Sequence, residues 1–112
     1  MVSALLRSFR CAFAGIGWAL RTQRNLRIHA LATFCVISLG FAVNLSAGKW
    51  CVILGCIGLV WMAELMNSAL EILCDRITTE PDEQIRRAKD AAAGAVLICA
   101  IISVIVAALV FL

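Results

Sequence analysis

Four polar residues in one otherwise apolar stretch are the side chains with the clearest capacity for chemistry. Glu64, Asn67, Glu71 and Asp75 follow one another at intervals of three or four residues. At about 100° per residue they would share one side of a helix, within an arc about 80° wide. Glu64 and Glu71 would then lie two turns apart, roughly 10 Å along the helix axis. The spacing predicts a helix that presents three carboxylates and one carboxamide on a single face.

Glu64 lies deepest among apolar neighbours. A carboxylate inside a membrane is costly unless it is paired or neutralised, and such residues are functional by default. This carboxylate suits a general base that acts on an alcohol presented at the same depth. The alternative is interhelical ion pairing, with Arg24, Arg27 or Lys89 as partners.

The carboxylates nearer the end of the same helix suit a metal. Mg²⁺ prefers hard oxygen ligands and commonly bridges to nucleotide phosphates. Lys89 and Asp90 are expected on the same side of the membrane, in reach of phosphates and metal. The combination predicts phosphoryl transfer to a membrane alcohol, a reaction in which positioning and charge neutralisation carry most of the catalysis.

The composition places these residues in a membrane. Of 112 residues, 63% are hydrophobic and 15% are charged, and the mean hydropathy is +1.00. Soluble domains have about 45–50% apolar and about 25% charged residues. Disordered chains combine low hydrophobicity with high charge. The sequence therefore excludes an ordinary soluble domain and a disordered chain.

Uncharged stretches locate the membrane spans. Residues 30–48 and 91–112 carry no charge, and residues 50–63 carry none before Glu64. Because a spanning helix needs roughly 20 mostly apolar residues, we predict spans at about 30–48, 50–70 and 91–112. Basic residues gather before the first span and between the second and third, so the N-terminus and the 74–90 loop are predicted to be cytoplasmic.

The first 29 residues have a separate pattern. Apolar residues recur at helical spacing on one face, and arginines lie on another. This pattern is typical of a helix that lies in the membrane interface with its apolar side in the lipid. The predicted fold is a single all-α membrane domain over residues 1–112, an amphipathic interfacial helix (1–29) followed by three transmembrane helices.

The remaining reactive side chains are predicted to be structural. The six cysteines have no CxxC pair and no zinc-like spacing, which favours reduced, apolar packing residues. His29, at a predicted membrane boundary, is interpreted as making a local hydrogen bond rather than binding a metal. Gly55, Gly58 and the small residues of 91–95 favour close helix packing, within the chain or between copies.

Three motifs in this order resemble the small bacterial integral-membrane lipid kinases, the prokaryotic diacylglycerol kinase and undecaprenol kinase family. Residues 63–71, followed by Asp75, are similar to the family's signature on its second span. Residues 87–96 are similar to its second motif. Residues 24–29 are similar to the segment before the first span in the undecaprenol-kinase-like branch. The resemblance covers essentially the whole chain.

The resemblance implies a role for each matching residue. Glu64 matches the catalytic base that takes the proton of the lipid hydroxyl, and Asn67 matches a substrate-binding residue beside it. Glu71 matches the ligand that holds Mg²⁺ against the phosphates of ATP. The further positions that match nucleotide-contacting residues are Glu80, Lys89 and Asp90.

The resemblance also implies an assembly and a location. The family forms homotrimers whose active sites are shared between neighbouring subunits, in the bacterial inner membrane. Its partners are ATP and a membrane lipid alcohol, undecaprenol or diacylglycerol, with no nucleic acid.

One position departs from the family pattern. Gln23 stands where the family usually has an acidic second metal ligand, and a neutral amide oxygen would hold the metal more weakly. The leading hypothesis is an active ATP- and Mg²⁺-dependent lipid kinase. The alternative is a non-catalytic or impaired membrane assembly protein of the same fold, and a carrier of ions or protons is a third class.

Overall fold

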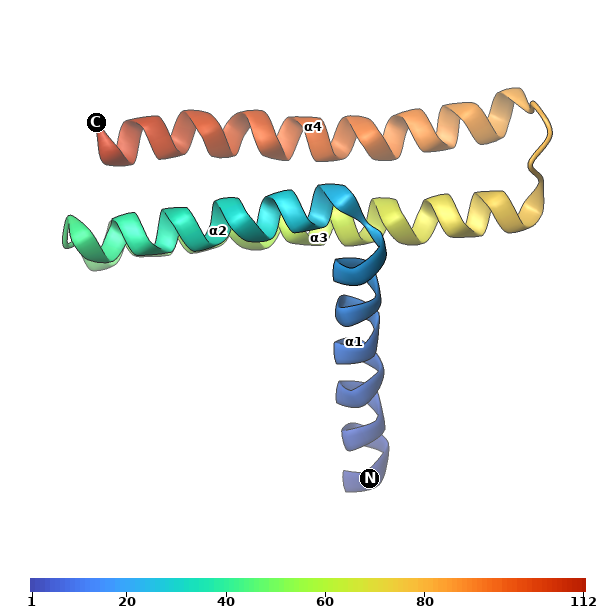
Figure 1. Cartoon of the computed structure of the whole chain (residues 1–112), viewed down its shortest axis with the longest axis horizontal. Helices are drawn as coiled ribbons and strands as arrows, with labels where there is room; N and C mark the ends of the chain where they lie inside the picture. The colour runs from blue at the N-terminus through green and yellow to red at the C-terminus, as the bar shows by residue number, and fades with distance from the viewer.

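The protein consists of four α-helices joined by short links, described over all 112 residues by a computed structural model (Figure 1). The helices are α1 (Val2–Thr22), α2 (Arg24–Ala42), α3 (Ala47–Ile77) and α4 (Glu83–Phe111). Three of them, α2, α3 and α4, are long and apolar enough to cross a membrane. The predicted all-α fold is confirmed, and the chain is a multi-pass membrane protein.

The three long helices run along a common direction, and α1 leaves them crosswise (Figure 1). The central helix is α3, which contacts each of the other three. This arrangement places the polar face of α3 where residues from α2 can reach it.

The break between α1 and α2 falls at Gln23, inside the segment that the sequence analysis treated as one helix. Gln23 has an extended backbone (φ −105°, ψ 110°) and ends one helix while it begins the next. The guanidinium of Arg27 donates hydrogen bonds to the carbonyl oxygens of Leu20 (3.2 Å) and Arg21 (2.9 Å). These bonds satisfy carbonyls that the end of α1 would otherwise leave free. The first long helix therefore begins at Arg24 rather than near residue 30.

The link between α3 and α4 is shorter than the predicted 74–90 loop. Only residues 78–82 are non-helical, because α3 continues to Ile77 and α4 begins at Glu83. A carboxylate oxygen of Asp82 accepts a hydrogen bond from the backbone N–H of Ile85 at 3.0 Å. Asp82 thus caps the N-terminus of α4, a role for which Asp is strongly preferred.

The link between α2 and α3 is a tight turn that depends on a glycine. Gly40 lies against the ring of Trp50, and a Cβ added at Gly40 would lie 2.7 Å from that ring. Phe41 also packs on Trp50, with ring centroids 4.9 Å apart. Asn44 takes a left-handed backbone conformation (φ 55°), which Asn tolerates better than most residues.

Few side chains are buried within one chain, and three of those are polar. The buried polar residues are Glu64, Asn67 and Ser68, all on α3. No residue of α4 is buried. Apolar side chains on the outer faces of the long helices are compatible with lipid, which is as apolar as they are.

Candidate active site

Glu64 lies on the side of α3 that faces α2 and is only 2% exposed. Its Oε2 atom lies 3.6 Å from Nε2 of His29, which comes from α2. The same Oε2 atom has no hydrogen-bond partner. Because a buried polar atom without a partner is costly, this oxygen is available to a group that the chain itself does not supply.

Asn67 lies between Glu64 and Glu71 on the same face of α3. Its amide nitrogen donates a hydrogen bond to Oε1 of Glu71 at 3.4 Å. Its Oδ1 atom is buried and has no partner. The hydroxyl of Ser68 donates to the backbone carbonyl of Glu64 at 3.0 Å, so it leaves the Glu64 carboxylate free. Two unsatisfied oxygens therefore lie one helical turn apart on the polar face.

The charged residues at the end of α3 form a second cluster with the start of α4. Nζ of Lys89 donates a hydrogen bond to Oδ1 of Asp75 at 2.6 Å. Lys89 lies before the uncharged part of α4. The hydrogen bond to Asp75 raises the pKa of Lys89, and the ammonium is charged at neutral pH. Asp75, Glu80 and Lys89 line one polar hollow of about 550 Å³. The lining holds four acids, Asp75, Glu80, Asp82 and Glu83, against two bases, Arg86 and Lys89. A phosphate-bearing ligand would therefore need a metal ion to offset the acids.

Asp90 does not line this hollow. Its carboxylate accepts a hydrogen bond from Arg86 at 3.0 Å, and Arg86 also pairs with Glu83. Within one chain, the structure therefore brings Glu80 and Lys89 together and leaves Asp90 in an exposed ion pair.

The two side chains expected to bind a metal, Glu71 and Gln23, do not belong to a cluster of metal-binding side chains. The structure contains no group of three or more His, Cys, Asp or Glu side chains placed to hold a metal ion. Glu71 is exposed, and its hydrogen bond comes from Asn67 alone. Gln23 lies at the junction of α1 and α2 and is partly buried. Mg²⁺ is commonly held by one or two carboxylates together with substrate phosphates, so Glu71 suits this ion when a nucleotide supplies further oxygens.

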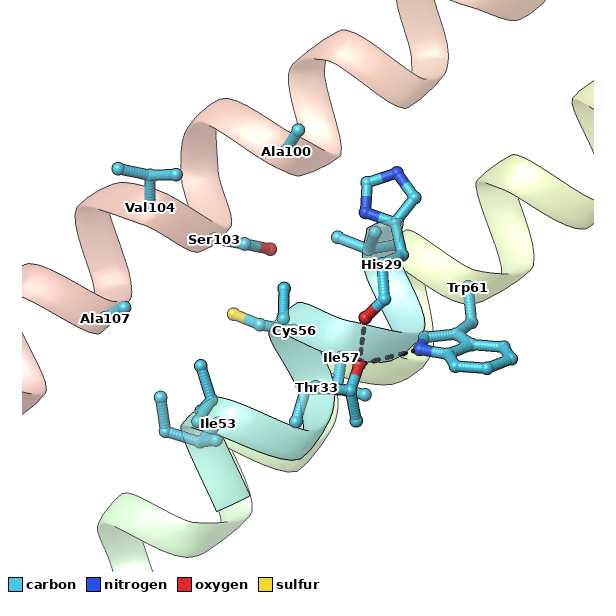
Figure 2. A pocket seen from close by; sticks show the side chains of 13 residues that line it. His29, Thr33, Ile53, Cys56, Ile57, Trp61, Ala100, Ser103, Val104 and Ala107 are labelled. Atoms are coloured by element: carbon cyan, nitrogen blue, oxygen red, sulfur yellow. Dashed lines mark hydrogen bonds between the residues drawn. The ribbon is translucent and has the colours of Figure 1, made fainter. Parts of the chain in front are cut away.

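An apolar cavity of about 230 Å³ adjoins the site between α2, α3 and α4. Figure 2 shows His29 and Thr33 on one wall, Trp61 beside them, and Ala100 and Ser103 across from them. The indole N–H of Trp61 donates a hydrogen bond to the hydroxyl oxygen of Thr33 at 2.9 Å. The cavity lies in the spanning part of the chain, where an apolar ligand would be accommodated.

The basic residues proposed as ion-pair partners of Glu64 are engaged elsewhere or make no ion pair. Arg27 bonds the end of α1, Lys89 bonds Asp75, and the ion pairs of the chain do not include Arg24. The pairing alternative, which concerned the acids of this face together, is confirmed for Asp75, which pairs with Lys89 of α4. Glu64 makes no ion pair with any of the three basic residues. The group that faces Glu64 is His29, which the sequence analysis assigned only a local role. His29 lies four residues before Thr33, which shares a hydrogen bond with Trp61 of α3, and the sequence alone does not show this pairing.

The comparisons with known proteins agree with this architecture. Residues 10–111 match the family of prokaryotic diacylglycerol kinases. The chain is 41% identical over 111 residues to an undecaprenol kinase of Bacillus subtilis, covering 99% of this chain and 90% of that protein. It is 43% identical over 103 residues to a diacylglycerol kinase of Synechocystis, covering 91% of this chain and 59% of that protein.

A third relative is more distant. The chain is 28% identical over 101 residues to a diacylglycerol kinase of Escherichia coli, covering 90% of this chain and 83% of that protein. The family match extends over nearly the whole chain and includes the polar face of α3, the interhelical link and the start of α4. The chain belongs to the prokaryotic diacylglycerol kinase family, a family of lipid kinases.

Proposed function

We propose that the protein transfers the γ-phosphoryl group of ATP to the hydroxyl of a membrane lipid alcohol and requires Mg²⁺. The observation that carries this proposal is the state of Glu64, a buried carboxylate with one oxygen that has no hydrogen-bond partner. A carboxylate in this position is suited to accept a proton from a hydroxyl that arrives through the lipid phase. Membership of a lipid kinase family supports the same reaction.

In the proposed step, the Glu64 carboxylate takes the proton of the lipid hydroxyl. The hydroxyl oxygen forms a bond to the γ-phosphorus, and the bond from that phosphorus to the oxygen of the β-phosphate breaks. ADP leaves with the electron pair of the broken bond. Asn67 presents its buried Oδ1 atom one turn away and orients the acceptor.

The nucleotide is assigned to the polar hollow at the end of α3. Lys89 and Glu80 line the hollow, and Asp90 follows Lys89 on the first turns of α4. Glu71 would hold Mg²⁺ through its carboxylate, and Gln23 would offer a neutral amide oxygen as a second ligand. When bound, the ion would neutralise charge on the phosphates, the main requirement of phosphoryl transfer.

We also propose the location and assembly of the enzyme. The basic residues of the N-terminal segment and of the 74–90 segment favour a cytoplasmic position for both, in the bacterial inner membrane. The complete site is proposed to form in a homotrimer, with neighbouring subunits contributing to each active site. The exposed faces of α4 in one chain are consistent with such an assembly.

The acceptor is proposed to be undecaprenol or diacylglycerol. Residues 24–29 resemble the undecaprenol-kinase-like branch, whereas the named relatives include both kinds of kinase. Radiolabelled ATP supplied to the protein in mixed micelles, with the two lipids side by side, distinguishes the acceptors by the lipid that gains the label.

The same assay tests the role of Glu64. Glu64→Gln removes the charge while keeping the size of the side chain, so we expect the rate to fall by about 10²- to 10⁴-fold, the usual contribution of a general base. The trimer is expected to persist in detergent. Lys49→Gln serves as the control, because it removes an exposed charge at the opposite end of α3, away from the hollow.

Two results would contradict the proposal in different ways. A native rate in Glu64→Gln would exclude Glu64 as the base. An inactive native chain, combined with a changed oligomer size in Glu64→Gln, would favour the non-catalytic assembly protein instead.

A further inference from the structure

We propose that His29 is a positioning residue for the catalytic base: its ring N–H donates a hydrogen bond to Glu64 and holds the carboxylate oriented. This inference rests on the proposed function, in which Glu64 accepts the proton of the lipid hydroxyl. It adds a residue of α2 to the site.

The geometry of the pair carries the proposal. Nε2 of His29 lies 3.6 Å from Oε2 of Glu64, and the two side chains are 21% and 3% exposed. Hydrogen bonds of this kind span about 2.7–3.2 Å, so a small rotation of the imidazole closes the gap. Catalytic hydrogen bonds are often long without substrate and tighten in the reacting complex.

A neighbouring hydrogen bond fixes the register of the two helices at this point. Trp61 on α3 donates to the hydroxyl oxygen of Thr33 on α2 at 2.9 Å. The Thr33 hydroxyl in turn donates to the backbone carbonyl of His29 at 2.7 Å (Figure 2). Thr33 lies about one turn from His29, and Trp61 about one turn from Glu64. The Trp61–Thr33 bond therefore holds the imidazole level with the carboxylate.

No other charged group competes for Glu64. His29 is the only basic side chain within 4.0 Å of the Glu64 carboxylate. The other titratable side chain on the adjoining cavity wall is Cys56 of α3. The wall formed by α4 contributes no titratable group, only residues such as Ala100 and Ser103. The ion pairs of the chain involve no residue of α1.

The chemical consequence concerns the orientation of the carboxylate. A carboxylate accepts several hydrogen bonds, so Oε2 can take the N–H of His29 and still meet the lipid hydroxyl. His29 would thus hold Glu64 in the geometry that accepts a proton. In the proposed step the proton passes from the lipid hydroxyl to Glu64, and His29 neither gains nor loses a proton.

The experiment compares His29→Leu with His29→Gln in the radiolabelled-ATP assay. His29→Leu removes the donor, and we expect kcat to fall by about ten- to hundredfold, the usual effect of losing a hydrogen bond to a charged group. KM for ATP should stay unchanged.

His29→Gln restores an N–H donor and should recover most of the rate. Phe34→Leu, which places a leucine on an exposed face of the same helix, is the matched control and should behave like the native chain. A purely structural role of His29 would lower the yield of folded protein without a recovery of kcat in His29→Gln.

The inference is overturned by an unchanged kcat in His29→Leu, or by a His29→Gln variant as slow as His29→Leu. Failure of the proposed function is a separate result, because the native chain would then label neither undecaprenol nor diacylglycerol.

Discussion

At the scale of single residues, the carboxylate of Glu64 is the side chain that is most costly to bury. Burying a charged group is costly unless it is paired and hydrogen-bonded, yet Oε2 of Glu64 has no hydrogen bond. An apolar residue at this position would avoid that cost. A buried carboxylate with an unsatisfied oxygen at this position supports the proposed proton transfer.

Gln23 is the residue at which the proposed metal site can be strengthened. A carboxylate in place of the neutral amide adds a charge near the ion, so Gln23→Glu should lower the Mg²⁺ concentration for half-maximal activity by roughly tenfold. The measurement is a Mg²⁺ titration of phosphoryl transfer at fixed ATP. Gln84→Glu, an equivalent change at an exposed position on α4, should leave the requirement unchanged.

Two other outcomes of this titration have distinct meanings. An unchanged Mg²⁺ requirement in Gln23→Glu would place residue 23 outside the metal site. Activity that is absent in the native chain and present in Gln23→Glu would mean that the native chain is not an active kinase.

At the scale of helices, the turn between α2 and α3 determines how His29 meets Glu64. The turn is tight because the Trp50 ring lies directly on Gly40 and against Phe41. A shift of α3 along α2 by one turn would move Glu64 about 5.4 Å from the imidazole. The packing at the turn and the Trp61–Thr33 hydrogen bond therefore both fix the position of α3 along α2.

Gly40→Ala tests the packing at this turn. The added methyl group would lie 2.7 Å from the Trp50 ring, so the ring must shift, and overpacking of this kind costs about 1–3 kcal/mol. Thermal unfolding in detergent should show a lower Tm for the variant than for the native chain.

Gly48→Ala is the control for this prediction, because a Cβ at Gly48 meets nothing within 4 Å. We expect a change of less than about 1 kcal/mol, neutral or stabilising, since alanine restricts the unfolded chain. Equal Tm values for the two variants would exclude a tight contact between Gly40 and Trp50.

At the scale of the whole molecule, one chain leaves much of its small-residue surface without a partner. A Cβ added at Gly55, Gly58 or Gly94 meets nothing within 4 Å. The packing that these residues favour is therefore not made within the chain. Contacts between copies would use them, in agreement with the proposed homotrimer.

Gly94→Leu tests this assembly. A large side chain in place of a small one on α4 would keep neighbouring helices apart, so the trimer fraction in detergent and the phosphoryl-transfer rate should both fall. Light scattering of the detergent-solubilised protein gives the oligomer mass. Leu97→Ile, an apolar exchange at an exposed position of the same helix, should retain the trimer. A trimer of native stability in Gly94→Leu would exclude residue 94 from the subunit contact.

Much of the fold follows from the order of charged and uncharged residues. The three membrane spans were predicted because residues 30–48, 50–63 and 91–112 carry no charge, and three helices long enough to span a membrane confirm them. The helix break at Gln23 was not predicted, since no Gly or Pro marks it. Hydrogen bonds from Arg27, four residues later, stabilise the break, and such a bond depends on where the chain turns.

The candidate site was likewise predicted only in part from the sequence. The sequence by itself determined that Glu64, Asn67 and Glu71 share one face of a helix, because helical spacing is a local property. Only the tertiary structure decided what each residue faces: Glu64 meets His29, Lys89 meets Asp75, and Asp90 meets Arg86. The physical reason is that partners across helices depend on register and packing, which arise from contacts distributed along the whole length of the helices.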